Sequence, residues 1–188
     1  LIKNKVSSYI FIITRYIDTT TNFWWKDVEV NGKVKGESSK EIRQTINKLK
    51  KITNKERIAI LNKIPSTEQK QLTSKELRYM IRNKMYVGNH THNHPMLNNC
   101  SDDEIQNELE TSKYLFNQWK IEGFDIFAYP NGDRTEKTDE ILLINHIKLA
   151  FLFDHSINST SITSMGISRI RTNADMPLSE LKVKASGL

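Results

Sequence analysis

Three of the five histidines in this chain fall within five consecutive positions, at His90, His92 and His94. Imidazole nitrogens are good ligands for zinc and similar divalent ions. Residues four positions apart share a face of a helical turn and also a face of an extended segment, so His90 and His94 can direct two imidazoles at one point. A surface polar run that happens to contain histidines is the alternative. A catalytic zinc usually takes three protein ligands, so the spacing alone leaves both interpretations open.

The elements around the histidines favour an α/β fold. A short strand over residues 85–88 leads directly into the histidine segment, and a strand over residues 124–128 leads into a Pro- and Gly-containing turn over residues 129–133. Strands alternate with helices along the chain, which predicts a mainly parallel sheet. Because such sheets place chemistry at the carboxyl ends of their strands, we expect the histidine segment and the turn to share one site.

The remaining elements follow from hydrophobic periodicity and from capping signals. Capping boxes are expected at Thr73 with Glu76 and at Ser101 with Glu104. Further strands are expected over residues 9–14, 148–153 and 167–171, and further helices over residues 74–83, 137–145 and from about 177. Residues 33–70 are expected to form a helical insertion, with a loop over 33–39 and an amphipathic helical stretch over 41–64 interrupted near Asn54. This insertion has too few apolar residues to form a core of its own.

Bulk composition limits the class of protein. The 188 residues suit a single domain over residues 1–188, with 37% hydrophobic and 27% charged residues. Cys100 is the only cysteine, which excludes an intramolecular disulfide and a cysteine-rich zinc site. The net charge is +6, but the basic residues are scattered and form no nucleic-acid motif, so no nucleic-acid partner is expected. No apolar run is long enough for a transmembrane segment, and the compartment, cytoplasmic or cell-envelope, stays open.

The segment over residues 87–97, which reads Val-Gly-Asn-His-Thr-His-Asn-His-Pro-Met-Leu, resembles the metal-binding motif of the polysaccharide deacetylases. This is the NodB-homology or carbohydrate esterase family 4 group, whose pattern is His-(Ser/Thr)-x-x-His, usually followed by Pro. Residues 9–25, 72–77, 127–133 and 167–170 resemble other segments of the family, so the resemblance spans nearly all of the chain. It implies a distorted, incomplete (β/α) barrel of the NodB-homology type.

The resemblance also implies a reaction and a set of site residues. His90 and His94 would be the metal ligands, for zinc in the first place and for cobalt, nickel or manganese as alternatives. The reaction would be hydrolysis of N-acetyl groups on an amino-sugar polysaccharide or a surface-glycan precursor, so the expected partner is an N-acetylated glycan. Asn131, through its backbone amide, and Tyr129 are the residues expected to contact the oxyanion or the substrate.

The chain departs from the family pattern in ways that bear on catalysis. Family members carry a Thr-Phe-Asp-Asp motif on their first strand, which supplies the base and the third ligand, and nothing before Tyr9 matches it. Ala128 stands where many members have an arginine. The family's late acid histidine has no clear match in this sequence. His155, at the end of a predicted strand, is the candidate for the catalytic acid, and a structural or solvated role is the alternative. Either the first strand is missing from this sequence, or the chain is a degenerate, non-catalytic carbohydrate-binding member of the same fold.

Overall fold

A four-stranded parallel sheet lies at the centre of the structure, a computed structural model that describes Lys3 and residues 6–186. The strands pair in chain order, and they are β1 (Ser8–Ile12), β2 (Met85–Asn89), β3 (Ile126–Ala128) and β4 (Leu149–Phe151). Parallel neighbours need crossover connections, and helices supply them here. The α/β class expected from the alternation of strands and helices is confirmed.

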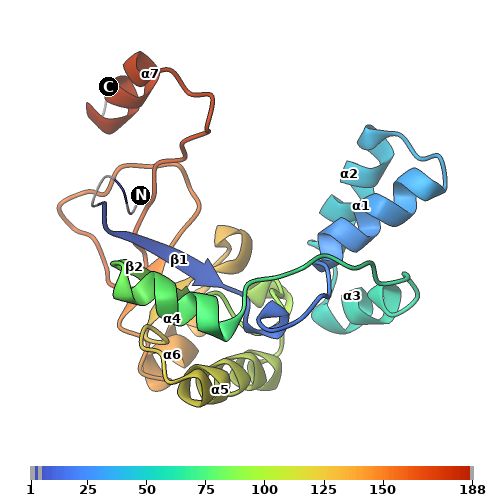
Figure 1. Ribbon diagram of the computed structural model, residues 1–188, viewed down its shortest axis with the longest axis horizontal. Coiled ribbons are helices and arrows are strands. Elements are labelled where there is room, and N and C mark those ends of the chain that lie inside the picture. The colour runs from blue at the N-terminus through green and yellow to red at the C-terminus, as the bar shows by residue number, and fades with distance from the viewer. Residues whose placement is uncertain (1–2, 4–5, 187–188) are drawn as a thin grey trace.

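Three helices accompany the sheet, namely α4 (Ser74–Arg82), α5 (Asp102–Trp119) and α6 (Glu136–Ile144) (Figure 1). Both expected capping boxes are present, because Thr73 and Ser101 each accept a hydrogen bond from the backbone N–H three residues on, and Glu76 and Glu104 bond back to the cap residue. The C-terminal helix α7 (Leu178–Ser186) follows a long irregular segment. No helix in the described part of the chain has the length and apolar character needed to cross a bilayer.

A second group of helices lies beyond the carboxyl end of β1. Figure 1 shows α1 (Trp24–Val34), α2 (Ser39–Leu49) and α3 (Asn54–Leu61) together, apart from α4 to α6, and the arrow of β1 points toward them. The expected loop over residues 33–39 begins later, because α1 continues to Val34. The buried core of this group joins Trp24, Val28 and Leu49 to Met96, which follows the histidine segment. This group of helices is therefore packed against the histidine segment.

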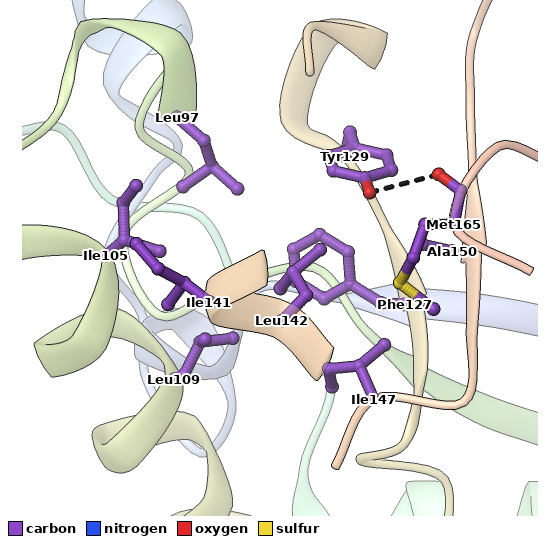
Figure 2. Packing of buried hydrophobic residues seen from close by; sticks show 10 residues of the cluster. All are labelled: Leu97, Ile105, Leu109, Phe127, Tyr129, Ile141, Leu142, Ile147, Ala150 and Met165. Carbon is purple, nitrogen blue, oxygen red and sulfur yellow. Dashed lines mark hydrogen bonds between the residues drawn. The ribbon is translucent and has the colours of Figure 1, made fainter. Parts of the chain in front are cut away.

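The main core lies between the sheet, α5 and α6 (Figure 2). It consists of Leu97, Ile105, Leu109, Phe127, Tyr129, Ile141, Leu142, Ile147, Ala150 and Met165. Residues from strands β3 and β4, from helices α5 and α6 and from the segments between elements meet here, so burial of apolar surface at this point holds the helices against the sheet.

The prediction of a closing strand over residues 167–171 is wrong. Over residues 167–171, all of which the structure describes, the only pairing is an isolated parallel bridge between Ile167 and Phe151. The Nε–H of Arg169 donates to the carbonyl oxygen of Leu152 (2.6 Å). A side-chain donor thus binds a carbonyl group in the segment where a longer ladder would have continued, and no further rung is formed beyond Ile167.

Candidate active site

The histidine loop, residues 90–94, begins where β2 ends. The rings of His90 and His94 lie with centroids 4.7 Å apart and planes at 74°. Nδ1 of His90 lies 2.7 Å from the carbonyl oxygen of Ala128, at the end of β3. A carbonyl oxygen can only accept, so Nδ1 carries the proton and Nε2 carries the lone pair. A metal-binding histidine commonly makes this kind of bond with its second nitrogen.

The surroundings of His94 also fit a metal ligand. Its Nδ1 atom is buried and has no hydrogen-bond partner among the described residues. A buried polar nitrogen without a partner costs free energy, and coordination of an ion would offset that cost. The Trp25 ring packs beside the imidazole, with centroids 4.9 Å apart, and Phe23 stacks on Trp25. The aromatic residues at the start of α1 therefore form one wall of the histidine pair.

Both imidazoles are held in the neutral state. Burial lowers the pKa of His90 to about 4, against the opposing effect of its hydrogen bond to Ala128, and the charge of Arg169 lowers it further. Burial likewise holds the pKa of His94 well below its usual range, and His90 and Arg57 add to this effect. A metal ligand must be a neutral imidazole, so this pair needs no deprotonation near neutral pH.

No third ligand joins the pair within the described part of the chain, where no cluster of three or more His, Cys, Asp or Glu side chains occurs. The His92 side chain does not join the pair, and its Nδ1 atom is hydrogen-bonded to the Thr14 hydroxyl at 3.0 Å. Asp18 and Asp27, the carboxylates that follow β1, accept hydrogen bonds from backbone N–H groups at 2.9 Å and 2.7 Å. The site thus contains two fitting ligands for a metal ion.

The backbone of the histidine loop is neither helical nor evenly extended. Thr91 has φ 66° and His94 has φ 55°, in the left-handed region that L-residues seldom adopt. Such conformations cost roughly 1–3 kcal/mol each and persist only where the surroundings impose them. The imidazoles of His90 and His94 therefore converge because the chain turns sharply at Thr91. Their spacing predicts a shared face of a regular helical or extended segment, but the backbone here is neither.

Two charged side chains that the sequence pattern did not single out hold this loop. Glu108, on α5, accepts hydrogen bonds from the backbone N–H groups of His92 and Asn93, both at 2.7 Å. Arg57, on α3, donates to the carbonyl oxygen of His94 at 3.1 Å. A signal was present only for Glu108, which lies beside Leu109 on the buried face of α5. The buried residues of α3 are Asn54 and Arg57, so no apolar face marked Arg57 in the sequence.

The turn after β3 brings a backbone N–H to the same end of the sheet. Asn131 lies in the short 3-10 helix η4 (Pro130–Gly132) with φ 60°, and its backbone N–H has no partner among the described residues. Its side chain accepts a hydrogen bond from Lys50 Nζ at 2.9 Å, just beyond α2. A polar groove of about 490 Å³ runs here between the insertion and the turn, and its lining residues are Asn47, Lys50, Lys51, Asn98, Asn99, Asn131 and Asp133.

Tyr129 has its side chain in the main core, where it is 1% exposed. Its hydroxyl donates to Asp139 (2.7 Å) and lies 3.0 Å from the carbonyl oxygen of Met165, the bond drawn in Figure 2. Burial raises the pKa of this hydroxyl, and the hydrogen bond to Asp139 raises it further. These contacts account for the side chain within the fold, so we leave Tyr129 out of the substrate contacts that we propose below.

Replacing Tyr129 with phenylalanine tests this structural role. We expect the free energy of unfolding to fall by about 1–3 kcal/mol, because the Asp139 carboxylate loses the buried donor of this hydrogen bond. Chemical denaturation measures the change, and an acetate-release assay at a temperature where both proteins are folded measures activity. A wild-type free energy of unfolding together with a loss of activity would contradict the core assignment and return Tyr129 to the substrate site.

His155 lies on an exposed segment after β4, with its ring against Phe153 at a centroid distance of 4.6 Å. Phe153 in turn packs closely on Gly132 of the turn, so this segment reaches the same end of the sheet. No contact joins His155 to His90 or His94 within the described residues. Its role as the catalytic acid stays a prediction.

Comparisons with known proteins agree with this geometry. The profile of the polysaccharide deacetylase family matches residues 1–148. Among solved structures, the chain is similar to the deacetylase PplD of Streptococcus pyogenes in complex with acetate, with 29% identity and a TM-score of 0.55 over 61% of this chain and 51% of that chain. A polysaccharide deacetylase from Bacillus cereus matches with 16% identity and a TM-score of 0.54 over 61% and 37% of the two chains. IcaB from Ammonifex degensii matches with 19% identity and a TM-score of 0.50 over 63% and 53%.

The structural matches show the fold class, which is the α/β fold of NodB-homology proteins with a distorted barrel. The family profile covers well over half of the sequence, so the chain belongs to the polysaccharide deacetylase family, as the histidine motif predicted. The matched regions span about half or less of the solved relatives. No match was found among curated protein sequences.

Proposed function

We propose that this chain removes N-acetyl groups from an amino-sugar polysaccharide or a surface-glycan precursor by metal-dependent hydrolysis. The observation that carries the proposal is the pair of neutral imidazoles of His90 and His94, 4.7 Å apart between ring centroids where β2 and β3 end. Membership of the deacetylase family supports the reaction class. PplD, the solved relative at 29% identity, holds acetate, which is the product that such hydrolysis would release.

His90 and His94 would hold the metal ion, with zinc as our first choice and cobalt, nickel or manganese as alternatives. A metal bound there would polarise the acetyl carbonyl and lower the pKa of a bound water. The Ala128 carbonyl keeps the His90 ring in one tautomer and orientation. We assign to the free N–H of Asn131 a hydrogen bond to the developing oxyanion, and to His155 the protonation of the leaving amine.

The direct test is release of acetate from N-acetylglucosamine oligomers. We expect release to stop after treatment with a chelator and to return when a divalent metal is added back, with heat-unfolded protein as the control. Hydrolysis also needs a carboxylate base, and the described residues contain no cluster that joins one to the histidines. The assay is therefore run on the 188-residue chain and on any longer form of the protein. Acetate release that is unaffected by the chelator would overturn the metal-dependent mechanism.

A second candidate function is non-catalytic carbohydrate binding by the same fold. The observation that favours it is the presence of two fitting ligands, and no third, among the described residues. Calorimetric titration with the same oligomers separates the two functions. Glycan binding without acetate release under any metal, in every length of chain tested, would favour the binding protein.

A further inference from the structure

The backbone conformation of the histidine loop must be stabilised by contacts with other parts of the chain. Two of its five residues, Thr91 and His94, have positive φ, and one of them is β-branched. Residues of this kind return to ordinary conformations unless their surroundings prevent it. Any side chain that fixes this backbone also fixes the directions of the His90 and His94 imidazoles.

One source of order is the carboxylate of Glu108, which is 7% exposed. One of its oxygens accepts from the backbone N–H groups of His92 and Asn93, and the other accepts from the Asn93 side-chain amide, all at 2.7 Å. Among the described residues Glu108 forms no ion pair within 4.0 Å. A nearly buried carboxylate thus directs all its side-chain hydrogen bonds to the histidine loop.

The other source of order is the guanidinium of Arg57, which is 3% exposed. It donates to the carbonyl oxygen of His94 at 3.1 Å and to Asn54 at 2.7 Å, and it lies over the ring of Trp24 at 5.4 Å. Its Nε atom is buried without a partner, and in the described part of the chain no carboxylate lies within ion-pair distance of the guanidinium. The Arg57 guanidinium, which comes from the helical insertion, thus also binds the backbone of the histidine loop.

Burial of two opposite charges that are not in contact is a poor way to stabilise a fold. Each charge loses its hydration, and well-packed apolar residues would often serve stability as well or better. Glu108 and Arg57 instead orient the backbone of the histidine loop, because their hydrogen bonds fix N–H and C=O groups of this strained segment. Outer partners that orient metal ligands act in this way in metal sites.

We propose that Glu108 and Arg57 are positioning residues, which hold the histidine loop from two separate helices and so aim His90 and His94 at a common metal ion. The inference rests on the proposed function and adds a role for the insertion. Through Arg57, helix α3 of the insertion becomes part of the metal site. A substrate lid or a peripheral decoration would not need a buried cation bonded to the backbone of a ligand residue.

Cobalt(II) alone is the probe, because its visible absorption reports the geometry of its ligands. Glu108→Ala and Arg57→Met are compared with wild type, and Glu110→Ala and Arg43→Met serve as matched controls at exposed positions on α5 and α2. Circular dichroism confirms that each protein is folded at the temperature of the titration. We expect 10- to 100-fold weaker cobalt binding and an altered absorption spectrum in the two test variants only.

Glu108→Gln separates positioning from simple stability. Its carbonyl oxygen can still accept from both backbone N–H groups, so we expect cobalt affinity and spectrum between those of Glu108→Ala and wild type. If Glu108→Ala does not fold, Glu108→Gln and Arg57→Met decide the question. Folded test variants with wild-type affinity and spectrum would overturn the inference while the metal site stands. Failure of the wild-type protein itself to bind cobalt would refute the proposed function, and the positioning role with it.

Discussion

Replacing His94 with alanine is expected to weaken binding of a divalent metal by on the order of 10²–10³-fold, with a matching loss of acetate release. Apparent binding free energies of ~10–16 kcal/mol for zinc sites with four ligands correspond to about 2.5–4 kcal/mol per ligand, which is a factor of this order. In this chain the loss leaves His90 as the only fitting imidazole of the pair. Metal content after dialysis and competition with a coloured chelator measure the change.

His146→Ala is the control for this variant. His146 is exposed, lies outside the site and has φ 64°, close to the φ of 55° at His94. The control therefore loses one imidazole and changes the same kind of backbone position without touching the proposed metal site. Equal metal content in wild type, His94→Ala and His146→Ala would show that His94 is not a ligand.

Replacing Gly123 with alanine is expected to lower the free energy of unfolding by roughly 3–5 kcal/mol, the sum of backbone strain and overpacking. Gly123 has φ 105°, outside the range that a residue with a Cβ adopts easily, and an added Cβ would overlap the carbonyl oxygen of Val87. Since the whole free energy of unfolding of a domain is only ~5–15 kcal/mol, this loss is a large share of it. Urea denaturation followed by circular dichroism gives the measurement.

Gly36→Ala is the matched control, because Gly36 also has a positive φ of 80° but has nothing within 4 Å of the added Cβ. We expect it to cost about 1 kcal/mol, the penalty for the backbone conformation alone. Val87 lies on β2, three residues before His90, so any shift that relieves the overlap at Gly123 also moves the strand that carries the site. Equal losses in the two variants would show that close packing against Val87 is unimportant.

Local signals in the sequence predicted several elements well. Thr73 and Ser101 mark the starts of α4 and α5 because a capping box is complete within four residues and needs no distant partner. Helix α1 was missed for the opposite reason. Its N-cap, Phe23, has no side-chain cap, and it contains Asn31 and Gly32, which are weak helix formers. Packing of its buried residues against α2, which cannot be read locally, stabilises it.

The histidine motif, its place after a strand and the family of the chain could all be recognised from the amino-acid sequence. These are properties of residues close together along the chain. The arrangement of the motif as a site, in contrast, follows from the three-dimensional fold. The tautomer of His90 and the hydrogen bonds of Glu108 and Arg57 to the histidine loop depend on contacts across 15 to 38 positions of sequence. Hydrogen bonds at such separations leave no period in the sequence, because folding alone brings their partners together.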